Sequence, residues 1–484
     1  MVKARALASV YGFAPLVLLA RNSRWAEPYR RVFESFGVRD FDGVHLHYYS
    51  PLALLRYLPQ ALVQLARLRT ADDVLRFSVD GIPMGDLIYD EVLRNTPGTY
   101  TVRGRSLALL RALLAFNGMY VKARRLFQRR DVRYLLMSHV SYVRFGVLCR
   151  VAGARNVPVI RDYRRYAGVE DLREHFRQPD PATIAGLAEH MGEECERFAD
   201  DYLSRRLAGK VMDSQAGTRT AYAGKRRYSR DELFGRVGMD PGKALVVVLP
   251  HIFSDAPRND VGMIYRDFYE WFVDTLAVAR EVEDVNWLIK EHPSARLYRE
   301  EGLTATVVRR CGGRNIFVAP PDLHTASAAL EARCLVMVRG TAMVEYGCLG
   351  IPTVKAGRSF YRDLGYAYDT SSVAEYRELL RRTGQLPRLT PEQIQMAKAT
   401  LFWREVCTTI PSRIVPPNRA SLDPREREAG ESRNFQHMAE WVEHPPNPLA
   451  SDPFYRSFEQ FAARDDRRFW LEVPESVHVA AGRD

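Results

Sequence analysis

Polar side chains stand directly after several apolar runs that predict buried strands. They occur in "LLMSH" with Ser138 and His139, in "VVLPH" with His251, in "WLIKEHP" with Lys290, His292 and Pro293, and in "LVMVRGT" with Arg339, Gly340 and Thr341. Lys290 and His292 are two residues apart, so an extended chain projects both side chains to one face. An ammonium and an imidazole there would form a phosphate clamp, and Pro293 would end the strand pairing. A His-Pro pair on its own is more often an ordinary turn.

The segment "RGTAMVEYGCLGIPTV" (339–354) predicts a second part of the same site. Its order is strand end, glycine, hydroxyl residue and helix. Gly340 would let a ligand approach the backbone, Thr341 would cap the helix, and the N–H groups of a helix start attract anions. Glu345 lies one helical turn after Thr341, where its carboxylate would suit ribose hydroxyls; the alternative is a solvated helix face.

Short apolar strands alternate with helical patterns along the whole chain, which predicts βαβ units and mainly parallel sheets. The expected strands lie at 15–20, 43–49, 132–139, 157–160, 244–251, 285–292, 315–320, 334–340 and 351–355. We expect an α/β fold with two Rossmann-like domains facing across a cleft, in which ligands bind outside the carboxyl ends of the strands. The predicted domains are 1–235 and 236–410, with a single long helix over 181–208. The tail 411–484 contains helical pieces that would pack back on the body.

The composition bounds the class of protein. The chain has 484 residues, of which 46% are hydrophobic and 27% charged, and its formal net charge is +11. No apolar run is long enough to cross a bilayer. Residues 6–20 could be a signal peptide, but the proline at 15 favours a buried strand. The six cysteines form no C-x-x-C pair, which favours reduced thiols over disulfides or zinc.

The positive charge suggests an anionic partner. The blocks "GKRRYSR" (224–230) and "KARRLFQRR" (122–130) would suit a peripheral contact with acidic lipid, although an arginine-rich composition can also reflect genome bias. They lack the interleaved aromatics of single-strand binders, and we recognise no nucleic-acid-binding motif.

The combination of "IKEHPSA" and "RGTAMVEYGCLGIPTV", about 50 residues apart, resembles bacterial capsule- and surface-polysaccharide glycosyltransferases of the GT-B type. This group includes the CMP-Kdo transferases of capsule synthesis, and related motifs occur in glycerophosphate polymerases of the teichoic-acid type. The resemblance spans roughly residues 80–360. It also draws on "GIPMGDLIYDEVLR" (81–94), "SHVSYVRFGVLCRVA" (138–152) and "LPHIFSDAP" (249–257).

The resemblance implies a role for each matching residue. Lys290 and His292 would contact the donor phosphate, and Glu345 would hold the ribose. Arg339 departs from the commoner serine or glycine, but its guanidinium would suit a diphosphate. The remaining substrate-binding candidates are His251, Ser254, Asp255, Pro293, Gly340 and Thr341.

Transfer to a hydroxyl group often uses a carboxylate or a histidine as general base. The first half offers Asp86, Asp90 and His139. Asp86 and Asp90 would share one helix face; alternatively, Asp86 caps the helix and Asp90 pairs with Arg94. "DFDG" (40–43) has a D-x-D spelling but favours a turn, and "HLH" (45–47) lacks a third ligand. We therefore expect neither a metal nor another cofactor.

The leading hypothesis is a cytoplasmic glycosyltransferase, peripheral at the inner face of the membrane. It would use a nucleotide-sugar donor, with a CMP-sugar favoured, and a glycan or lipid-linked acceptor. Three alternatives stay open: a CDP-polyol phosphotransferase of the teichoic-acid type, a nucleotide-sugar 2-epimerase, and a non-catalytic assembly protein.

Overall fold

Contacts between residues divide the computed structural model into two compact units. The first comprises Met1–His175 and Thr408–Glu472, and the second comprises Phe176–Cys407 and Val473–Asp484. The contacts place the helical segment 181–207 with the second unit, whereas the predicted domain boundary at 235 lies after it. The structure describes residues 2–20, 26–35, 37–44, 51–163, 166–169, 178–208, 221–222, 224–259, 262–408, 440, 444, 451–452, 455–456 and 458–460. Most of the predicted tail 411–484 lies outside these residues.

The second unit is built on a six-stranded parallel sheet. Its strands are β8 (Ala244–Val248), β9 (Val285–Ile289), β10 (Ile316–Val318), β11 (Cys334–Met337), β12 (Thr353–Lys355) and β13 (Ala367–Tyr368). They are arranged in the order β10-β9-β8-β11-β12-β13 with every neighbouring pair parallel. The first strand in sequence is thus central, the next two extend the sheet to one side and the last three to the other. This order is that of the Rossmann fold.

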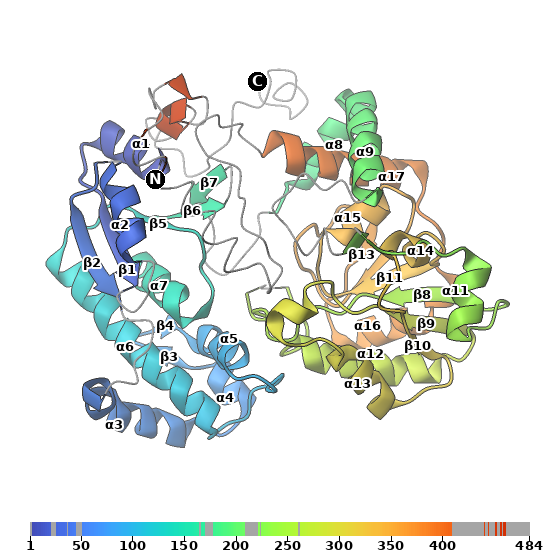
Figure 1. Cartoon of the computed structure of the whole chain (residues 1–484), viewed down its shortest axis with the longest axis horizontal. Coiled ribbons are helices and arrows are strands. Elements are labelled where there is room, and N and C mark those ends of the chain that lie inside the picture. Colours follow the sequence, from blue (N-terminus) through green and yellow to red (C-terminus); the bar gives the residue numbers. More distant parts are fainter. Residues whose placement is uncertain are drawn as a thin grey trace. The chain divides into compact units, whose positions relative to one another are not determined.

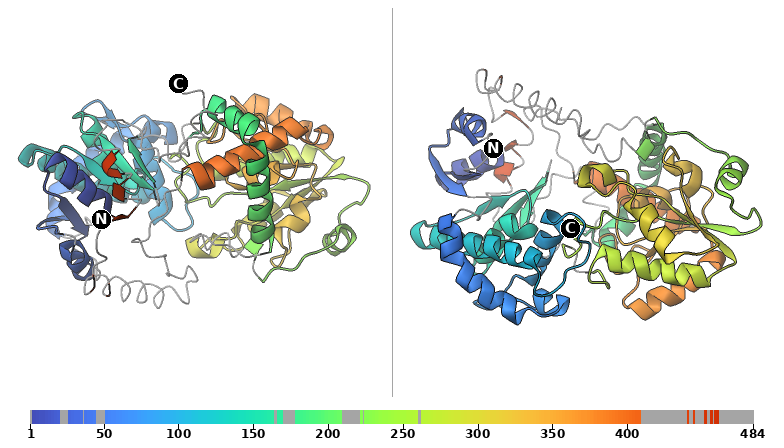
Figure 2. Two further views of the ribbon diagram at one scale, coloured as in Figure 1. Left: turned by 90° about the horizontal axis from the view of Figure 1, so that it is seen from above. Right: turned by 60° about the horizontal axis from the view of Figure 1, so that its bottom comes forward.

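Helices cover both faces of this sheet (Figures 1 and 2). They are α8 (Pro181–His190), α9 (Gly192–Leu207), α11 (Arg230–Val237), α12 (Phe268–Glu281), α13 (Leu303–Cys311), α14 (Thr325–Ala329), α15 (Ala342–Gly347), α16 (Val373–Arg381) and α17 (Pro391–Phe402). Short 3-10 turns lie at Ala295–Tyr298 and Thr383–Gln385, and a π-helical turn lies at Trp403–Cys407.

Alternation along the central strand explains the two layers. Leu245 and Val247 of β8 share a buried cluster with residues of α11, α14 and α15. Successive side chains of a strand point to opposite faces, so Val246 and Val248 face the other layer. All four are buried. A strand that is buried on both faces is a continuous apolar run, and this is why the sequence predicted it.

Local signals fix where the helices begin. Thr390 and Ser229 each form a capping box at the start of α17 and α11, and Asp267 caps α12 through the backbone N–H of Glu270 at 2.7 Å. The Asp267 cap explains why α12 begins at Phe268.

The predicted helix 181–208 is two helices. Met191 leaves the helical region of the backbone, and α9 begins at Gly192. A Cβ at Gly192 would lie 3.0 Å from Nε2 of Gln395, which donates to the Gly192 carbonyl at 2.9 Å. Further along, Lys398 Nζ lies 2.7 Å from Glu196 Oε1. The break therefore lets α8 and α9 pack against α17, about 200 residues away in the sequence.

The first unit combines helices with short strands. Its elements are α1 (Val2–Tyr11), β1 (Leu16–Ala20), α2 (Ala26–Ser35), β2 (Asp40–Val44), α3 (Pro51–Arg67), α4 (Ala71–Leu75), β3 (Ser78–Val79), β4 (Ile82–Pro83), α5 (Gly85–Asn95), α6 (Leu107–Arg129), β5 (Leu135–Met137), a π-helical turn (Tyr142–Gly146), α7 (Val147–Gly153), β6 (Val159–Tyr163) and β7 (Tyr166–Val169). β1 pairs with β2 and β5 with β6, both in parallel, while β6–β7 and β3–β4 are antiparallel. A large apolar core lies between α3, α5, α6 and α7.

The predicted α/β class, with parallel sheets flanked by helices, is confirmed. The predicted cleft between two domains stays a prediction. Within the described residues, no helix has both the length and the apolar character that a membrane crossing requires.

Candidate functional site

The strand order of the second unit defines where a ligand site would lie. The chain leaves β8 toward one side of the sheet and leaves β11 toward the other, so the connections at their carboxyl ends diverge. Such a switch point is the usual binding crevice of open α/β sheets. The structure brings three predicted groups to this edge: His251–Asp255 after β8, Lys290–Pro293 after β9, and Arg339–Thr341 after β11.

Lys290 is a buried cation with no described counter-charge. It follows β9, and its backbone N–H still donates to the Val248 carbonyl at 3.0 Å. Its side chain is 8% exposed. Among the described residues, Nζ has no hydrogen-bond or ion-pair partner. Burial, together with the positive charge of Lys225, lowers the pKa of Lys290 to about 8, an effect that the Glu291 carboxylate opposes. Burying a charge without a partner is unfavourable, so an anionic ligand would relieve this site.

His292 presents a hydrogen-bond donor beside Lys290. The backbone N–H of Ser294 donates to its Nδ1 at 3.1 Å. An accepting Nδ1 places the proton of the neutral ring on Nε2. Burial lowers the pKa of His292 to about 4, with Lys290 lowering it further and Asp255 opposing. At neutral pH the ring is therefore uncharged and can donate through Nε2. Pro293 is exposed in the turn that follows.

His251, in the loop after β8, lies close to His292. Its ring stacks on Phe268 with centroids 4.4 Å apart, and the His292 ring is 5.6 Å away. Burial is the main reason that the pKa of His251 falls well below its ordinary value, and the charge of Arg339 and the neighbouring His292 ring add to the effect. The Arg339 guanidinium lies 5.0 Å from the centre of the Phe268 ring. Phe268, the first residue of α12, thus contacts both an imidazole and a guanidinium.

The loop after β8 is held in place by a buried carboxylate. Glu300 accepts from the backbone N–H of Phe253 at 2.8 Å, from that of Ser254 at 3.0 Å, and from Ser254 Oγ at 2.6 Å. Tyr298 donates to Asp255 Oδ1 at 3.2 Å. The Ser254 hydroxyl and one Asp255 oxygen therefore form hydrogen bonds within the protein that hold this loop. A substrate-binding role for the two residues stays a prediction.

Arg339 connects the loops after β8 and β11. Its Nη2 donates to the carbonyl oxygens of Asp255 and Ala256 at 3.2 and 3.3 Å. Ala256 has a φ of +47°, a strained conformation for a residue with a Cβ. Strain of this kind persists where the surroundings fix the backbone, often at ligand sites. Gly340, with a φ of +149°, supplies the turn that follows Arg339.

Thr341 differs from its prediction. It begins α15, but its side chain makes no capping hydrogen bond. The reason is its helical backbone (φ −70°, ψ −18°), because a capping side chain requires an extended backbone. α15 has six residues, so the argument for an anion site at its start is not supported.

Glu345 is buried rather than solvated. It is 3% exposed, and its Oε1 lies 2.7 Å from Nη2 of Arg206 in α9. Tyr222 donates to its other oxygen at 3.5 Å. Burial alone would lower the pKa of Arg206, but the Glu345 carboxylate raises it above its ordinary value. The proposed ribose contact stays a prediction, and the described contacts of this carboxylate are internal.

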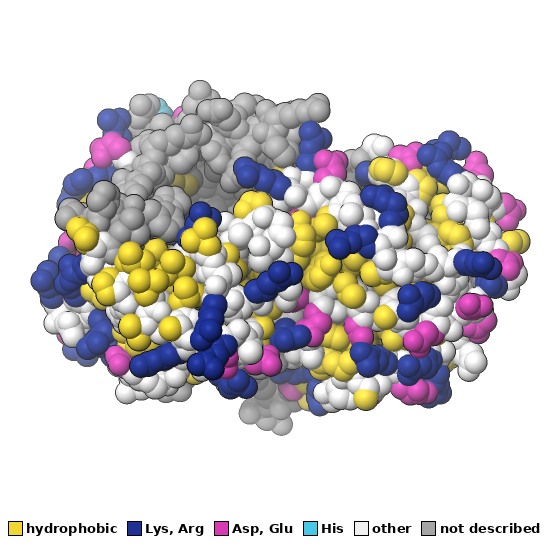
Figure 3. All heavy atoms as spheres, turned by 90° about the horizontal axis from the view of Figure 1, so that it is seen from below, with side chains coloured by type: hydrophobic (Ala, Val, Ile, Leu, Met, Phe, Trp, Pro, Cys, Tyr) yellow, Lys and Arg dark blue, Asp and Glu magenta, His cyan; other side chains and the backbone are white. Residues whose placement is uncertain are grey.

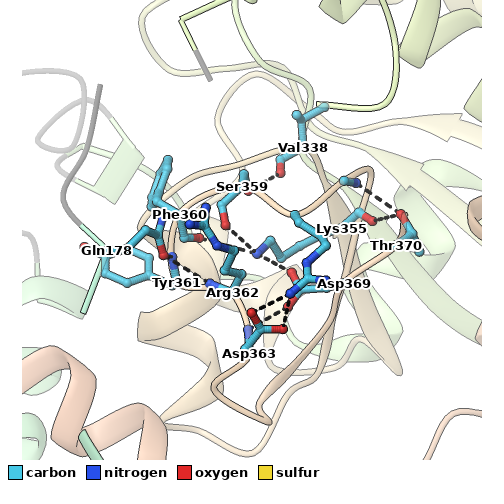
Figure 4. A network of polar contacts seen from close by, with 12 residues as sticks. Gln178, Val338, Lys355, Ser359, Phe360, Tyr361, Arg362, Asp363, Asp369 and Thr370 are labelled. Carbon is cyan, nitrogen blue, oxygen red and sulfur yellow. Dashed lines mark hydrogen bonds and ion pairs between the residues drawn. The ribbon is translucent and has the colours of Figure 1, made fainter. Parts of the chain in front are cut away.

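A buried network supports the turn before Arg339 (Figure 4). Lys355 is fully buried, and its Nζ donates to Asp369 Oδ1 at 2.6 Å and to carbonyl oxygens of the loop after β12. In that loop, Ser359 Oγ donates to the Val338 carbonyl at 3.0 Å, and the Tyr361 N–H donates to Gln178 at 2.8 Å. Lys355 is a paired buried lysine with a structural role, in contrast to Lys290.

The three catalytic candidates lie in the first unit and have different surroundings. Asp86 forms a two-pronged ion pair with Arg150, which also donates to the Pro83 carbonyl at 2.6 Å. Asp90, four residues on, is buried. His139 is exposed after β5, with its ring 5.4 Å from that of Phe145. Asp86 therefore neither caps α5 nor is free, and the catalytic role of all three stays a prediction.

The first unit also contains the D-x-D sequence at 40–43 and the H-x-H sequence at 45–47, which resemble metal-binding motifs. Residues 40–43 are part of β2 and not a turn. Asp42 pairs with Lys122 at 2.5 Å and Asp40 with Arg130 at 2.9 Å. The histidines at 45 and 47 lie outside the described residues. Across the described part of the chain, no group of three or more His, Cys, Asp or Glu side chains could hold a metal ion.

Sequence reasoning missed Lys225 and Glu300. The basic block at 224–230 would suit a membrane contact, and that stays a prediction; within it, the Arg226 backbone pairs with the segment after β10, its N–H donating to the Asp322 carbonyl at 2.8 Å. Lys225 Nζ donates to the Pro321 carbonyl at 2.6 Å, within electrostatic range of Lys290. Contacts between segments about 100 residues apart leave no local pattern in the sequence. The same holds for the hydrogen bonds of Glu300 with the loop after β8, which lies nearly 50 residues earlier.

Comparisons with known proteins add a limited likeness. No model of a protein family matches the sequence, and no curated protein matches it. KpsC of Thermosulfurimonas dismutans, a beta Kdo 2,4 transferase, is similar at 14% identity and a TM-score of 0.33, covering 53% of this chain and 76% of that one. The wall teichoic acid polymerase TagF is similar at 16% identity and a TM-score of 0.23, covering 44% of this chain and 47% of that one. The S. aureus MnaA–UDP structure is similar at 10% identity and a TM-score of 0.30, covering 82% of this chain and 87% of that one. At these TM-scores the function has to be argued from the site itself.

Proposed function

We propose that this protein is a glycosyltransferase of bacterial surface polysaccharide synthesis. It takes a sugar from a nucleotide-activated donor, with a CMP-sugar favoured, and transfers it to a glycan or lipid-linked acceptor. The observation that carries the proposal is the pair formed by Lys290 and His292 at the switch point of the Rossmann sheet. There, a buried ammonium without a described partner adjoins a ring whose Nε2 is free to donate.

This pair suits the chemistry of a departing nucleotide. When the glycosidic bond to the donor breaks, negative charge develops on the phosphate oxygens. A fixed cation and a fixed N–H donor stabilise that charge more strongly as it grows, and they do so best where water is excluded. The backbone N–H of Ser294 holds the His292 ring, so the imidazole needs little reorganisation on binding, and the Val248 carbonyl holds the backbone of Lys290.

The location of the protein follows from the proposed acceptor. A lipid-linked acceptor would be met at the inner face of a membrane, and a net charge of +11 would favour an acidic lipid surface. We therefore propose a cytoplasmic protein with a peripheral membrane contact.

The test is a binding and turnover panel. CMP-, CDP-, UDP- and GDP-linked compounds are offered to the purified protein. Affinity is measured by calorimetry, and nucleotide release is measured with and without a lipid-linked glycan acceptor. We expect CMP-sugars to bind, CMP to be released only with acceptor, and His292→Ala to weaken binding at least about tenfold through loss of a charge-assisted hydrogen bond.

His190→Ala is the matched control, because His190 is an exposed histidine of α8 in the same unit. Equal donor affinity of His292→Ala and the unmodified protein would overturn the site assignment, and so would failure of all four donor classes to bind. Turnover to an epimer without acceptor would identify an epimerase instead. Transfer of a polyol phosphate from a CDP-linked donor, with CMP released, would identify a phosphotransferase.

A further inference from the structure

Helix α3 of the first unit is fixed in its orientation by a buried amide pair. Gln64 Nε2 donates to Asn117 Oδ1 of α6 at 3.1 Å, and Asn117 Nδ2 donates back to Gln64 Oε1 at 3.0 Å. Ala61 and Leu68 are buried on the same side. These contacts settle which face of α3 packs on α6 and which face points outward.

The outward face of α3 is apolar as well. Leu55, Leu62 and Val63 are 77%, 46% and 55% exposed, and spacings of seven and eight residues place them on one face. Leu107, the first residue of α6, is 63% exposed close to the end of α3. These four residues, here called the α3 surface, are four of the seven large hydrophobic side chains exposed in the described chain. A helix that is apolar on both sides while one side faces solvent indicates a partner.

The α3 surface is bordered by positive charge. Figure 3 shows hydrophobic side chains gathered on this part of the first unit with Lys and Arg side chains around them. α3 contains no acidic residue. Arg105 joins the end of α3, since its Nη2 donates to the Ala66 carbonyl at 3.0 Å. The exposed arginines on and beside α3 are Arg56, Arg67, Arg69 and Arg105.

We propose that the α3 surface docks on the surface of an anionic phospholipid bilayer. The aliphatic side chains would enter the boundary between head groups and acyl chains, while the arginines contact lipid phosphates, as in helices that lie in the membrane interface. The positive border favours an anionic lipid over a neutral apolar partner. The inference rests on the proposed membrane contact and not on the donor site, which lies in the other unit.

Flotation with vesicles tests this docking surface. Full-length protein is mixed with vesicles of phosphatidylglycerol and phosphatidylethanolamine, or of phosphatidylcholine alone. We expect binding to the anionic vesicles that weakens with added salt. Each leucine that leaves water accounts for about a tenfold change in partition, so Leu55→Ser with Leu62→Ser should lower vesicle binding by about 100-fold. Arg56→Gln with Arg67→Gln should lower it by about ten- to 100-fold.

Matched controls lie in the second unit. Leu330 is 43% exposed on its own, so Leu330→Ser should leave vesicle binding unchanged. Arg309→Gln with Arg310→Gln removes the same charge from an exposed part of α13 and should have a much smaller effect. Donor binding in solution should be the same in every one of these variants, which separates failure of this surface from failure of the donor site.

Two results would overturn the proposal. One is equal vesicle binding by the Leu55/Leu62 double variant and the unmodified protein. The other is a dimer that the same double variant dissociates, measured by sedimentation, because a second copy of the chain would then be the partner of the α3 surface.

Discussion

Replacement of Lys290 by methionine should make the protein more stable and poorer at binding its donor. Methionine is unbranched like lysine, is one atom shorter, and removes the charge. Lys290 and Lys398 are both 8% exposed, but Lys398 Nζ lies 2.7 Å from Glu196 and 3.4 Å from Asp200. Lys398→Met is therefore the matched control: an equally buried lysine with partners.

The magnitude follows from the pKa of Lys290, which burial, aided by the charge of Lys225, lowers from 10.5 to about 8. Such a difference corresponds to about 3 kcal/mol less free energy of unfolding at pH 7. Between pH 8 and 10.5 the unfolded chain binds more protons than the folded chain, so the stability of the unmodified protein rises with pH there. The advantage of Lys290→Met should shrink to roughly 1 kcal/mol by pH 10.

Urea unfolding at pH 7 and pH 10 measures this difference, with the fluorescence of the buried tryptophans Trp271 and Trp287 reporting on the second unit. At pH 7 the free energy of unfolding of Lys290→Met should be about 3 kcal/mol higher than that of the unmodified protein. That of Lys398→Met should be roughly 1 kcal/mol lower, because this change breaks an ion pair. Calorimetry with CMP-linked donors should show at least about a tenfold loss of affinity for Lys290→Met.

Two results would refute the reasoning at different points. If Lys290→Met is less stable than the unmodified protein at pH 7, then the Lys290 ammonium contributes favourably to the fold, and its burial does not indicate a ligand. If the variant is more stable yet binds the donor equally well, the anion that neutralises Lys290 is not the donor phosphate.

Two further predictions concern the frame of the site. Glu345→Gln should lower the free energy of unfolding by about 3 kcal/mol, because Arg206 would stay buried without its counter-charge; a carboxylate that bound ribose would instead lower nucleotide affinity and leave urea unfolding unchanged. Gly357→Ala should lower the melting temperature strongly, since a Cβ there would lie 2.2 Å from the Gly262 carbonyl oxygen. Gly365→Ala, at a φ of +80° with open surroundings, should cost only about 1–2 kcal/mol, and equal melting temperatures of the two variants would contradict the close approach.

The sequence predicted the second unit well as far as β12. Buried parallel strands are short apolar runs between helical segments, so β8 to β12 were placed within a few residues of their observed positions. β13, α16 and α17 were not predicted. β13 pairs over two residues only, Ala367 and Tyr368, and such a strand lacks an apolar run. The break at Gly192 was not predicted, and its contact with Gln395 in a distant helix leaves no local signal in the sequence.

The candidate site was predicted in part. Lys290 and His292 could be found because both follow one strand, and strand ends are where ligands bind. The contacts of Glu345 could not be predicted, because its partner Arg206 is in α9, some 140 residues upstream. The place of Lys225 beside Lys290 could not be predicted either, because its contact with Pro321 spans about 100 residues of sequence.

The packing of α8 and α9 on α17 bears on how the chain is made. Glu196 and Lys398 are about 200 residues apart, and a ribosome adds roughly 5–20 residues per second. The first two helices of the second unit therefore leave the ribosome roughly 10–40 seconds before the helix that covers them. During that interval their apolar faces are open to water and to chaperones. Synthesis of α17 should thus be the event that covers α8 and α9 and ends the exposure of these faces to aggregation.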